Sequence, residues 1–157
     1  MRNVIHHLVP KIRTYVDGTG LLLLRLSVGY EFASAGWIKL QNLTPPEWFT
    51  GLHFPLPHTL LSTQANWISA GLLESVLGLA IILGLYSRVS SLVLLYVTYI
   101  AVYTVHFDLG WAGWNQIDTD EGLGFKVPLL LGLMLFAIFT QGPGRFSLDH
   151  LKERPAH

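Results

Sequence analysis

Three ionisable side chains lie within long apolar stretches of the sequence, where they could form a proton-transfer or ligand site. Arg25 and Glu31 belong to an apolar stretch over residues 21–40, and Glu74 belongs to another over residues 67–86. Ionisable groups in such surroundings are costly unless they face a protein interior and find a partner. Two carboxylates that meet there could share a proton or accept hydrogen bonds.

Helix geometry predicts that the two carboxylates lie at one level. A helix that begins near Thr19 places Glu31 roughly 18 Å along its axis, at about 1.5 Å per residue. A helix that begins near Asn66 and runs the opposite way places Glu74 roughly 12 Å along its axis. In an apolar layer about 30 Å thick these levels coincide. The sequence therefore predicts a shared site formed by Glu31 and Glu74.

A stripe of aromatic residues could line the same site. Its members follow one another at spacings of three and four residues, and therefore share one face of a helix: Tyr96, Tyr99, Tyr103 and His106. Tyr99 and Tyr103 bracket the predicted level of the carboxylates. We expect Tyr99, Tyr103 and Arg25 to contact a cofactor.

Three interpretations of these residues stay open. Glu31, Glu74 and His106 could carry proton or quinone chemistry, and in that case they are the predicted catalytic residues. The charges could instead lock helices together, because buried charges and tyrosine stripes are often structural. A metal is the third interpretation, since His106 and Asp108 could ligate one with a histidine of another loop. We assign no metal ligand, and Met134 as the only internal methionine disfavours a copper(I) site.

The composition predicts one membrane domain over residues 1–157. Hydrophobic residues make up 51% of the chain and charged residues 13%, against about 25% charged residues in ordinary soluble domains. The formal net charge is zero, which gives no support to nucleic-acid binding. Cysteine is absent, which excludes disulfides, Cys-ligated zinc and thiol–disulfide exchange by this chain. The alternative, a soluble all-α bundle, would need helices with a polar outer face.

Four membrane-spanning helices are expected to position these side chains, in an all-α transmembrane four-helix bundle. A span needs about 20 mostly apolar residues, and the predicted spans cover residues 20–40, 66–86, 89–107 and 124–141. Shorter helices are expected at the membrane surface, in the N-terminal stretch up to Val16 and in the loop that holds Trp48. Five glycines are interpreted as marks of close helix contact: Gly29, Gly36, Gly71, Gly78 and Gly84.

The positions of Lys and Arg predict the orientation of these spans. Arg13 precedes the first predicted span, Arg88 lies between the second and third, and Arg154 follows the fourth. The other two loops are mainly acidic. By the positive-inside rule, both termini are expected in the cytoplasm.

Several short motifs, in this order, resemble those of the DoxX family. They are Leu24-Arg25-Leu26 with Gly29, Phe32, Gly36 and Lys39; Glu74 with Gly78 and Gly84-Leu85-Tyr86-Ser87-Arg88; Thr104-Val105-His106; and Gly142-Pro143-Gly144-Arg145-Phe146-Ser147-Leu148-Asp149. The resemblance covers roughly residues 21–151. It implies a four-helix, multi-pass protein of the bacterial inner membrane.

The resemblance also suggests a role in redox chemistry. One relative of the family is the small subunit of a thiosulfate:quinone oxidoreductase, which implies an accessory or quinone-linked subunit of a membrane redox system. The cofactor stays unassigned, with a quinone favoured over copper, and the expected partners are the lipid bilayer and a protein partner or a second copy. Tyr30-Glu31-Phe32 and residues 124–129 are similar to a branch near maturation genes for copper-associated ribosomal peptides. The alternative function is therefore a non-catalytic scaffold or a copper-peptide handling protein.

Overall fold

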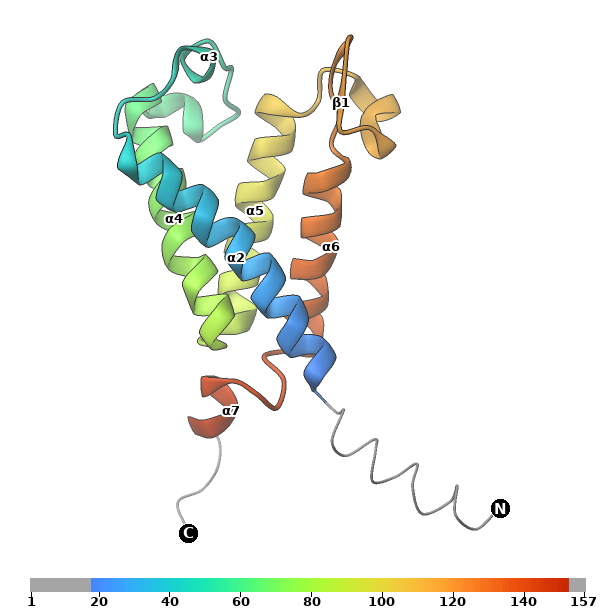
Figure 1. Ribbon diagram of the computed structural model, residues 1–157. Helices are drawn as coiled ribbons and strands as arrows, with labels where there is room; N and C mark the ends of the chain where they lie inside the picture. Colours follow the sequence, from blue (N-terminus) through green and yellow to red (C-terminus); the bar gives the residue numbers. More distant parts are fainter. Residues whose placement is uncertain (1–17, 153–157) are drawn as a thin grey trace, which may run out of the picture.

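The computed structural model describes residues 18–152, and this part of the chain is mostly helical, as predicted. Four long helices run side by side: α2 (Thr19–Gln41), α4 (Thr63–Leu83), α5 (Ser87–Val105) and α6 (Lys126–Gln141) (Figure 1). Each begins and ends within three residues of a predicted span. The predicted surface helix that ends near Val16 lies outside the described residues.

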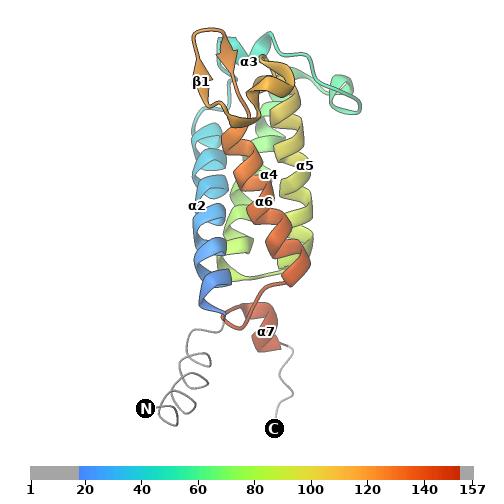
Figure 2. The same ribbon diagram turned by 90° about the vertical axis from the view of Figure 1, so that its right-hand side faces the viewer.

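The four long helices form two close pairs that pack against each other. In Figures 1 and 2, which are related by a 90° turn, α2 packs against α4 and α6, and α5 packs against the same two helices. Helices α2 and α5 are therefore diagonal to one another. The apolar core between the four helices consists of Val28, Phe32, Ile81, Leu94, Leu135 and Ile138.

Each end of the molecule has its own set of short elements. At one end, called the α7 end below, α7 (Leu148–Lys152) lies beside the turn between α4 and α5 (Figure 1). The opposite end, called the loop end, carries α3 (Glu47–Thr50), η1 (His58–Leu60), η2 (Gly110–Asn115), β1 (Asp118–Thr119) and β2 (Gly122–Leu123). The short helix expected beside Trp48 is α3.

The antiparallel pair β1–β2 departs from an all-helical fold, and local polar contacts explain it. The Thr119 hydroxyl donates to the Gly122 carbonyl at 2.9 Å, which closes the turn between the strands. The Asp108 carboxylate accepts the backbone N–H of Leu123 at 3.1 Å and ties the hairpin to the chain that follows α5. The second contact depends on a side chain fifteen residues away, and a hydropathy pattern does not predict it.

Two of the described helices are long and apolar enough to cross a membrane, namely α4 and α5. Helix α6 is equally apolar in character but has 16 residues. Helix α2 has 23 residues, yet Arg25, Glu31 and Lys39 lower its hydropathy. By length and composition the structure thus supports two spans directly, and passage of α2 and α6 through a bilayer stays a prediction.

The C-terminal motif, residues 142–149, holds α7 against the turn between α4 and α5 through hydrogen bonds of Asp149. Gly84 ends α4 in the left-handed conformation, with φ of 69°, and its carbonyl accepts the backbone N–H of Asp149 at 3.0 Å. The Asp149 carboxylate in turn accepts the backbone N–H groups of Tyr86 at 2.9 Å and Ser87 at 3.0 Å. These are N–H groups that the first turn of α5 cannot satisfy by itself. Asp149 therefore caps α5 from a distant part of the chain.

Replacing Asp149 with alanine is expected to lower the free energy of unfolding by about 1–2 kcal/mol, the usual cost of losing an N-terminal helix cap. Thermal or denaturant unfolding of the purified protein measures this change. Asp120→Ala is the matched control, because Asp120 is exposed in the hairpin turn. Equal stability of the two variants would show that the cap contributes nothing.

Candidate functional site

A cavity of about 200 Å³ opens between α4 and α5 near the loop end. Its walls also include the end of α2 and the loop that holds α3 and η1. Most of the lining is apolar or aromatic, from residues such as Phe49, Phe54, Leu73, Val97 and Ile100. Ligand pockets typically combine such a lining with a few placed polar groups, and this cavity has them at its base and at its rim.

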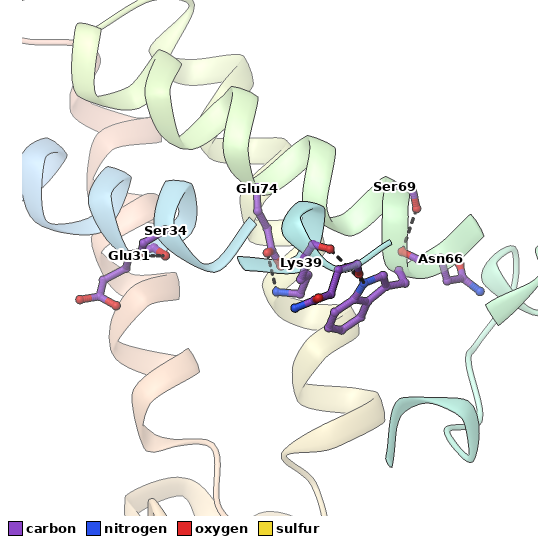
Figure 3. A network of polar contacts seen from close by, with 8 residues as sticks. Glu31, Ser34, Lys39, Asn66, Ser69 and Glu74 are labelled. Carbon is purple, nitrogen blue, oxygen red and sulfur yellow. Dashed lines mark hydrogen bonds and ion pairs between the residues drawn. The ribbon is translucent and has the colours of Figure 1, made fainter. Parts of the chain in front are cut away.

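An ion pair between two helices forms the polar base of the cavity. The Lys39 Nζ of α2 lies 2.6 Å from the Glu74 Oε2 of α4 (Figure 3). Glu74 is 7% exposed, so the bond is formed largely away from solvent. A buried charge needs such a partner, and the ammonium keeps further donor N–H groups for a ligand.

Trp67 holds the backbone that carries Lys39. Its indole N–H donates to the carbonyl of Lys39 at 3.1 Å and to the carbonyl of Asn42 at 2.7 Å. The Lys39 ammonium lies 5.8 Å from the centre of the Trp67 ring, within the range of a cation–π contact. The ring of Phe49 packs edge-on against Trp67, with centroids 4.9 Å apart. The loop after α2 thus closes over the ion pair.

A histidine joins α4 to α5 at the rim of the cavity. His58 Nδ1 lies 2.9 Å from Asn66 Oδ1, and His58 Nε2 lies 3.0 Å from the Tyr96 hydroxyl. The Asn66 amide also donates to the His58 carbonyl at 2.9 Å. The His58 and Tyr96 rings stack with centroids 5.7 Å apart. These contacts fix η1 over the cavity mouth.

His106 lines the cavity from the residue that follows α5. Its Nδ1 is buried and has no hydrogen-bond partner among residues 18–152. The backbone of Gly124 and the carboxylate of Asp108 lie close to the same ring. The free Nδ1 can exchange a hydrogen bond or a proton with a ligand.

The predicted pair of carboxylates does not form. Glu74 is buried, but Glu31 is exposed on α2 and points away from Glu74 (Figure 3). The partner of Glu74 is Lys39 instead. Gly36 of α2 lies against Ser75 of α4, so Glu74 lies more than one helical turn beyond Glu31 toward the loop end. The two carboxylates also face different directions around their helices.

The tyrosine stripe also faces away from the cavity in large part. Tyr99 is 57% exposed and Tyr103 is 54% exposed, and neither lines the cavity, whereas Tyr96 and His106 do. The cofactor contact predicted for Tyr99 and Tyr103 is therefore not formed by this cavity.

Arg25 lies far from the cavity, at the α7 end, and binds backbone carbonyls. Its Nε donates to Ile81 O at 3.0 Å and its Nη2 to Ile82 O at 2.9 Å. Its Nη1 donates to Pro143 O and, at 2.9 Å, to Phe146 O. With 1% of its surface exposed, Arg25 joins α2, the end of α4 and the C-terminal segment. These contacts give Arg25 a structural role, and its predicted contact with a cofactor stays a prediction.

Sequence reasoning missed two residues of the cavity as members of the site, Lys39 and Asn66, whereas it did include Tyr96 in the stripe expected to line it. The sequence did contain a signal for Lys39, because it is the basic residue in the last turn of α2 and Glu74 is the acidic residue of the antiparallel helix α4. The roles of His58 and Asn66 depend on the fold of the loop, which has no periodic pattern. Among residues 18–152, no group of three or more His, Asp or Glu side chains is placed to hold a metal ion.

Comparison with known proteins agrees with the motifs in the sequence. Residues 20–107 match the family model named DoxX. A protein of Haemophilus influenzae that is described as uncharacterized is 32% identical over 143 residues, which cover 90% of this chain and 88% of that protein. No solved structure matches the chain. The match to the family model covers more than half of the sequence, and the chain therefore belongs to the DoxX family.

Proposed function

We propose that this protein is a quinone-linked or accessory subunit of a membrane redox system, and that the cavity receives the ring of a quinone. In this proposal all four long helices cross the bacterial inner membrane, with the α7 end and both termini on the cytoplasmic side. The observation that carries the proposal is an apolar cavity with an interhelical ion pair at its base and the unpartnered Nδ1 of His106 in its wall.

The dimensions and polarity of the cavity suit a quinone ring. Drug-sized ligands occupy pockets of about 300–1,000 Å³, so a cavity of about 200 Å³ accommodates a single substituted ring. The two carbonyl oxygens of a quinone accept hydrogen bonds, and Lys39 is a donor at the base. His106 can donate or accept in the wall. The apolar lining would contact the ring itself, and the opening would leave space for the tail.

The residues of the cavity could also supply protons. Reduction of a quinone to a quinol takes up two electrons and two protons. Glu74 and His106 are the proton-carrying groups in the lining, and the Lys39 ammonium could stabilise the charge that develops on a carbonyl oxygen. In the proposal the electrons come from a redox protein that binds this subunit.

The test is binding of a short-chain ubiquinone or menaquinone to the full chain in detergent or nanodiscs. Glu74→Gln and His106→Ala are each expected to weaken binding at least tenfold, or about 1.4 kcal/mol. Glu31→Gln is the matched control, because this carboxylate points away from the cavity, and its affinity should equal that of the wild type.

Two other results would redirect the assignment. If quinone binding is absent, or is the same in all three variants, the cavity is not a quinone site. Capture of one specific partner protein without any bound quinone would then favour the non-catalytic scaffold. Stoichiometric copper that is lost on His106→Ala would favour copper handling.

A further inference from the structure

A groove lies at the α7 end, opposite the cavity of the proposed function. This α7 groove has a volume of about 550 Å³ and lies between the start of α2, the end of α4 and the segment that forms α7. Three apolar side chains of its wall are about half exposed: Leu83 of α4, Phe146 and Leu151. Apolar surface beside the end of a helix that is apolar enough to cross a membrane is suited to contact with acyl chains.

Arg145 gives the α7 groove an exposed positive charge. It lines the groove and is exposed, whereas Arg25 in the same wall is 1% exposed and donates to backbone carbonyls. A guanidinium presents its N–H donors in a planar fork that fits two oxygens of a phosphate group. The start of α2 lies against this residue, because a Cβ on Gly18 would be 3.1 Å from the Arg145 Cβ. The groove therefore combines an apolar wall with a group that suits a phosphate.

The described residues around the groove carry an excess of positive charge. Asp149 is the only acidic residue in the parts of the chain that meet at the α7 end, namely residues 18–25, 80–92 and 138–152. Its carboxylate already accepts two backbone N–H groups at the start of α5. The Lys and Arg residues of the same parts are Arg25, Arg88, Arg145 and Lys152. Basic pockets at the ends of membrane-spanning helices bind anionic lipid headgroups.

We propose that the α7 groove binds an anionic phospholipid from the leaflet that the α7 end faces. The phosphate group binds to Arg145, and the acyl chains lie along Leu83, Phe146 and Leu151. This inference rests on the membrane crossing of α4 in the proposed function, but it involves neither the quinone nor its cavity. A free phosphate ion would leave the apolar wall without a partner, and a zwitterionic lipid carries a cation that the basic residues repel.

Binding to the full chain in detergent tests the proposal, with phosphatidylglycerol, phosphatidylcholine and glycerol phosphate as the probes. Native mass spectrometry should show that phosphatidylglycerol binds about tenfold more tightly than phosphatidylcholine. Glycerol phosphate has the charged group without acyl chains and should not bind. Bound phosphatidylglycerol should also raise the temperature of unfolding, because it binds the folded state. Equal affinity for the two lipids, or binding of glycerol phosphate as tightly as the anionic lipid, would overturn the proposal.

Substitutions at the α7 end locate the lipid. Arg145→Gln is expected to weaken phosphatidylglycerol binding about fivefold, because it removes the charge that binds the phosphate. Arg88→Gln is the matched control, since Arg88 is exposed at the same end but is not among the described residues that line the groove. Its affinity should equal that of the wild type. If both variants weaken binding equally, the lipid is attracted by the basic surface as a whole and the groove is not its site.

A photoreactive benzophenone side chain in place of Leu151 identifies the occupant of the groove in native membranes. An adduct with an anionic phospholipid is expected. An adduct only with a zwitterionic lipid, with the N-terminal segment of the same chain or with another protein would contradict the proposal. Arg145→Gln should leave quinone binding unchanged, and Glu74→Gln should leave phosphatidylglycerol binding unchanged. Failure of the quinone proposal and failure of this inference are therefore distinguishable.

Discussion

Replacing Arg25 with methionine is expected to lower the free energy of unfolding by about 4 kcal/mol, the largest effect of any single side chain at the α7 end. The side chain satisfies four backbone carbonyls at once. Leaving buried polar groups without a partner costs about 1–3 kcal/mol each, and some of these carbonyls would regain water in the variant. Methionine keeps the apolar part of the side chain, so the change removes the guanidinium with its four hydrogen bonds and its attraction to Asp149. Unfolding by heat or denaturant in detergent measures it.

Two further variants separate the role of Arg25 from the effect of charge alone. Arg25→Lys is expected to recover only a small part of the loss, because one ammonium cannot reach carbonyls on opposite sides as a planar guanidinium does. Arg88→Met removes an exposed arginine from the same end and should change stability by less than about 0.5 kcal/mol. If Arg25→Met unfolds like the wild type, the four hydrogen bonds contribute nothing net. If Arg25→Lys keeps full stability but loses quinone, Arg25 belongs to a ligand site after all.

The sequence predicts the levels of the charged residues only approximately and their directions poorly. Helical rise predicts one level for Glu31 and Glu74, whereas the contact of Gly36 with Ser75 places Glu74 more than one turn farther toward the loop end. A level also contains no information about rotation around the axis. The positions of the glycines indicate this rotation, because glycines mark the face of a helix that contacts a neighbouring helix. Gly29 and Gly36 face α4, and at 100° per residue Glu31 lies about 200° from Gly29, on the far side. Considered together, the positions of the glycines and of the charges predict that Glu31 lies on the face of α2 that points away from α4.

The orientation of α5 shows a second reason why the cavity differs from the site that we predicted. Its buried face carries Ser87, Ser91 and Thr98, while its tyrosines are exposed. The Ser91 hydroxyl donates to Ser87 O at 2.7 Å and the Thr98 hydroxyl to Leu94 O at 2.8 Å. Small hydroxyl residues satisfied by their own helix can be buried at little cost. The tyrosines therefore lie on the exposed face of α5, and a role of Tyr99 and Tyr103 in binding a cofactor stays a prediction.

The partners of Arg25 were inaccessible to sequence reasoning for a different reason. Its contacts with Pro143 and Phe146 join positions 118 and 121 residues apart. The sequence does indicate that a buried arginine needs acceptors, but carbonyl oxygens occur at every residue. Which carbonyl oxygens Arg25 binds depends on how α2, the end of α4 and the C-terminal segment pack together at the α7 end.

Substituting alanine for Gly36 is expected to lower the free energy of unfolding by about 3 kcal/mol, at the upper end for overpacking. A Cβ at this position would lie 2.6 Å from the carbonyl oxygen of Gly71 and would also meet the backbone nitrogen of Ser75. Both atoms belong to the backbone of α4, which cannot rotate away as a flexible side chain would. The two helices must therefore separate along their length. Denaturant unfolding measures the loss.

Gly132→Ala gives the matched control, because its added Cβ would meet only Leu95, at 3.8 Å. Alanine favours helix over glycine by about 1 kcal/mol, so this variant should be slightly more stable than the wild type. The two substitutions are chemically identical and have opposite expected signs. Separation of α2 from α4 also pulls Lys39 away from Glu74, so Gly36→Ala should weaken quinone binding, and Gly132→Ala should not. Equal stability of Gly36→Ala and Gly132→Ala would mean that α2 and α4 are not held in the close contact on which the cavity depends.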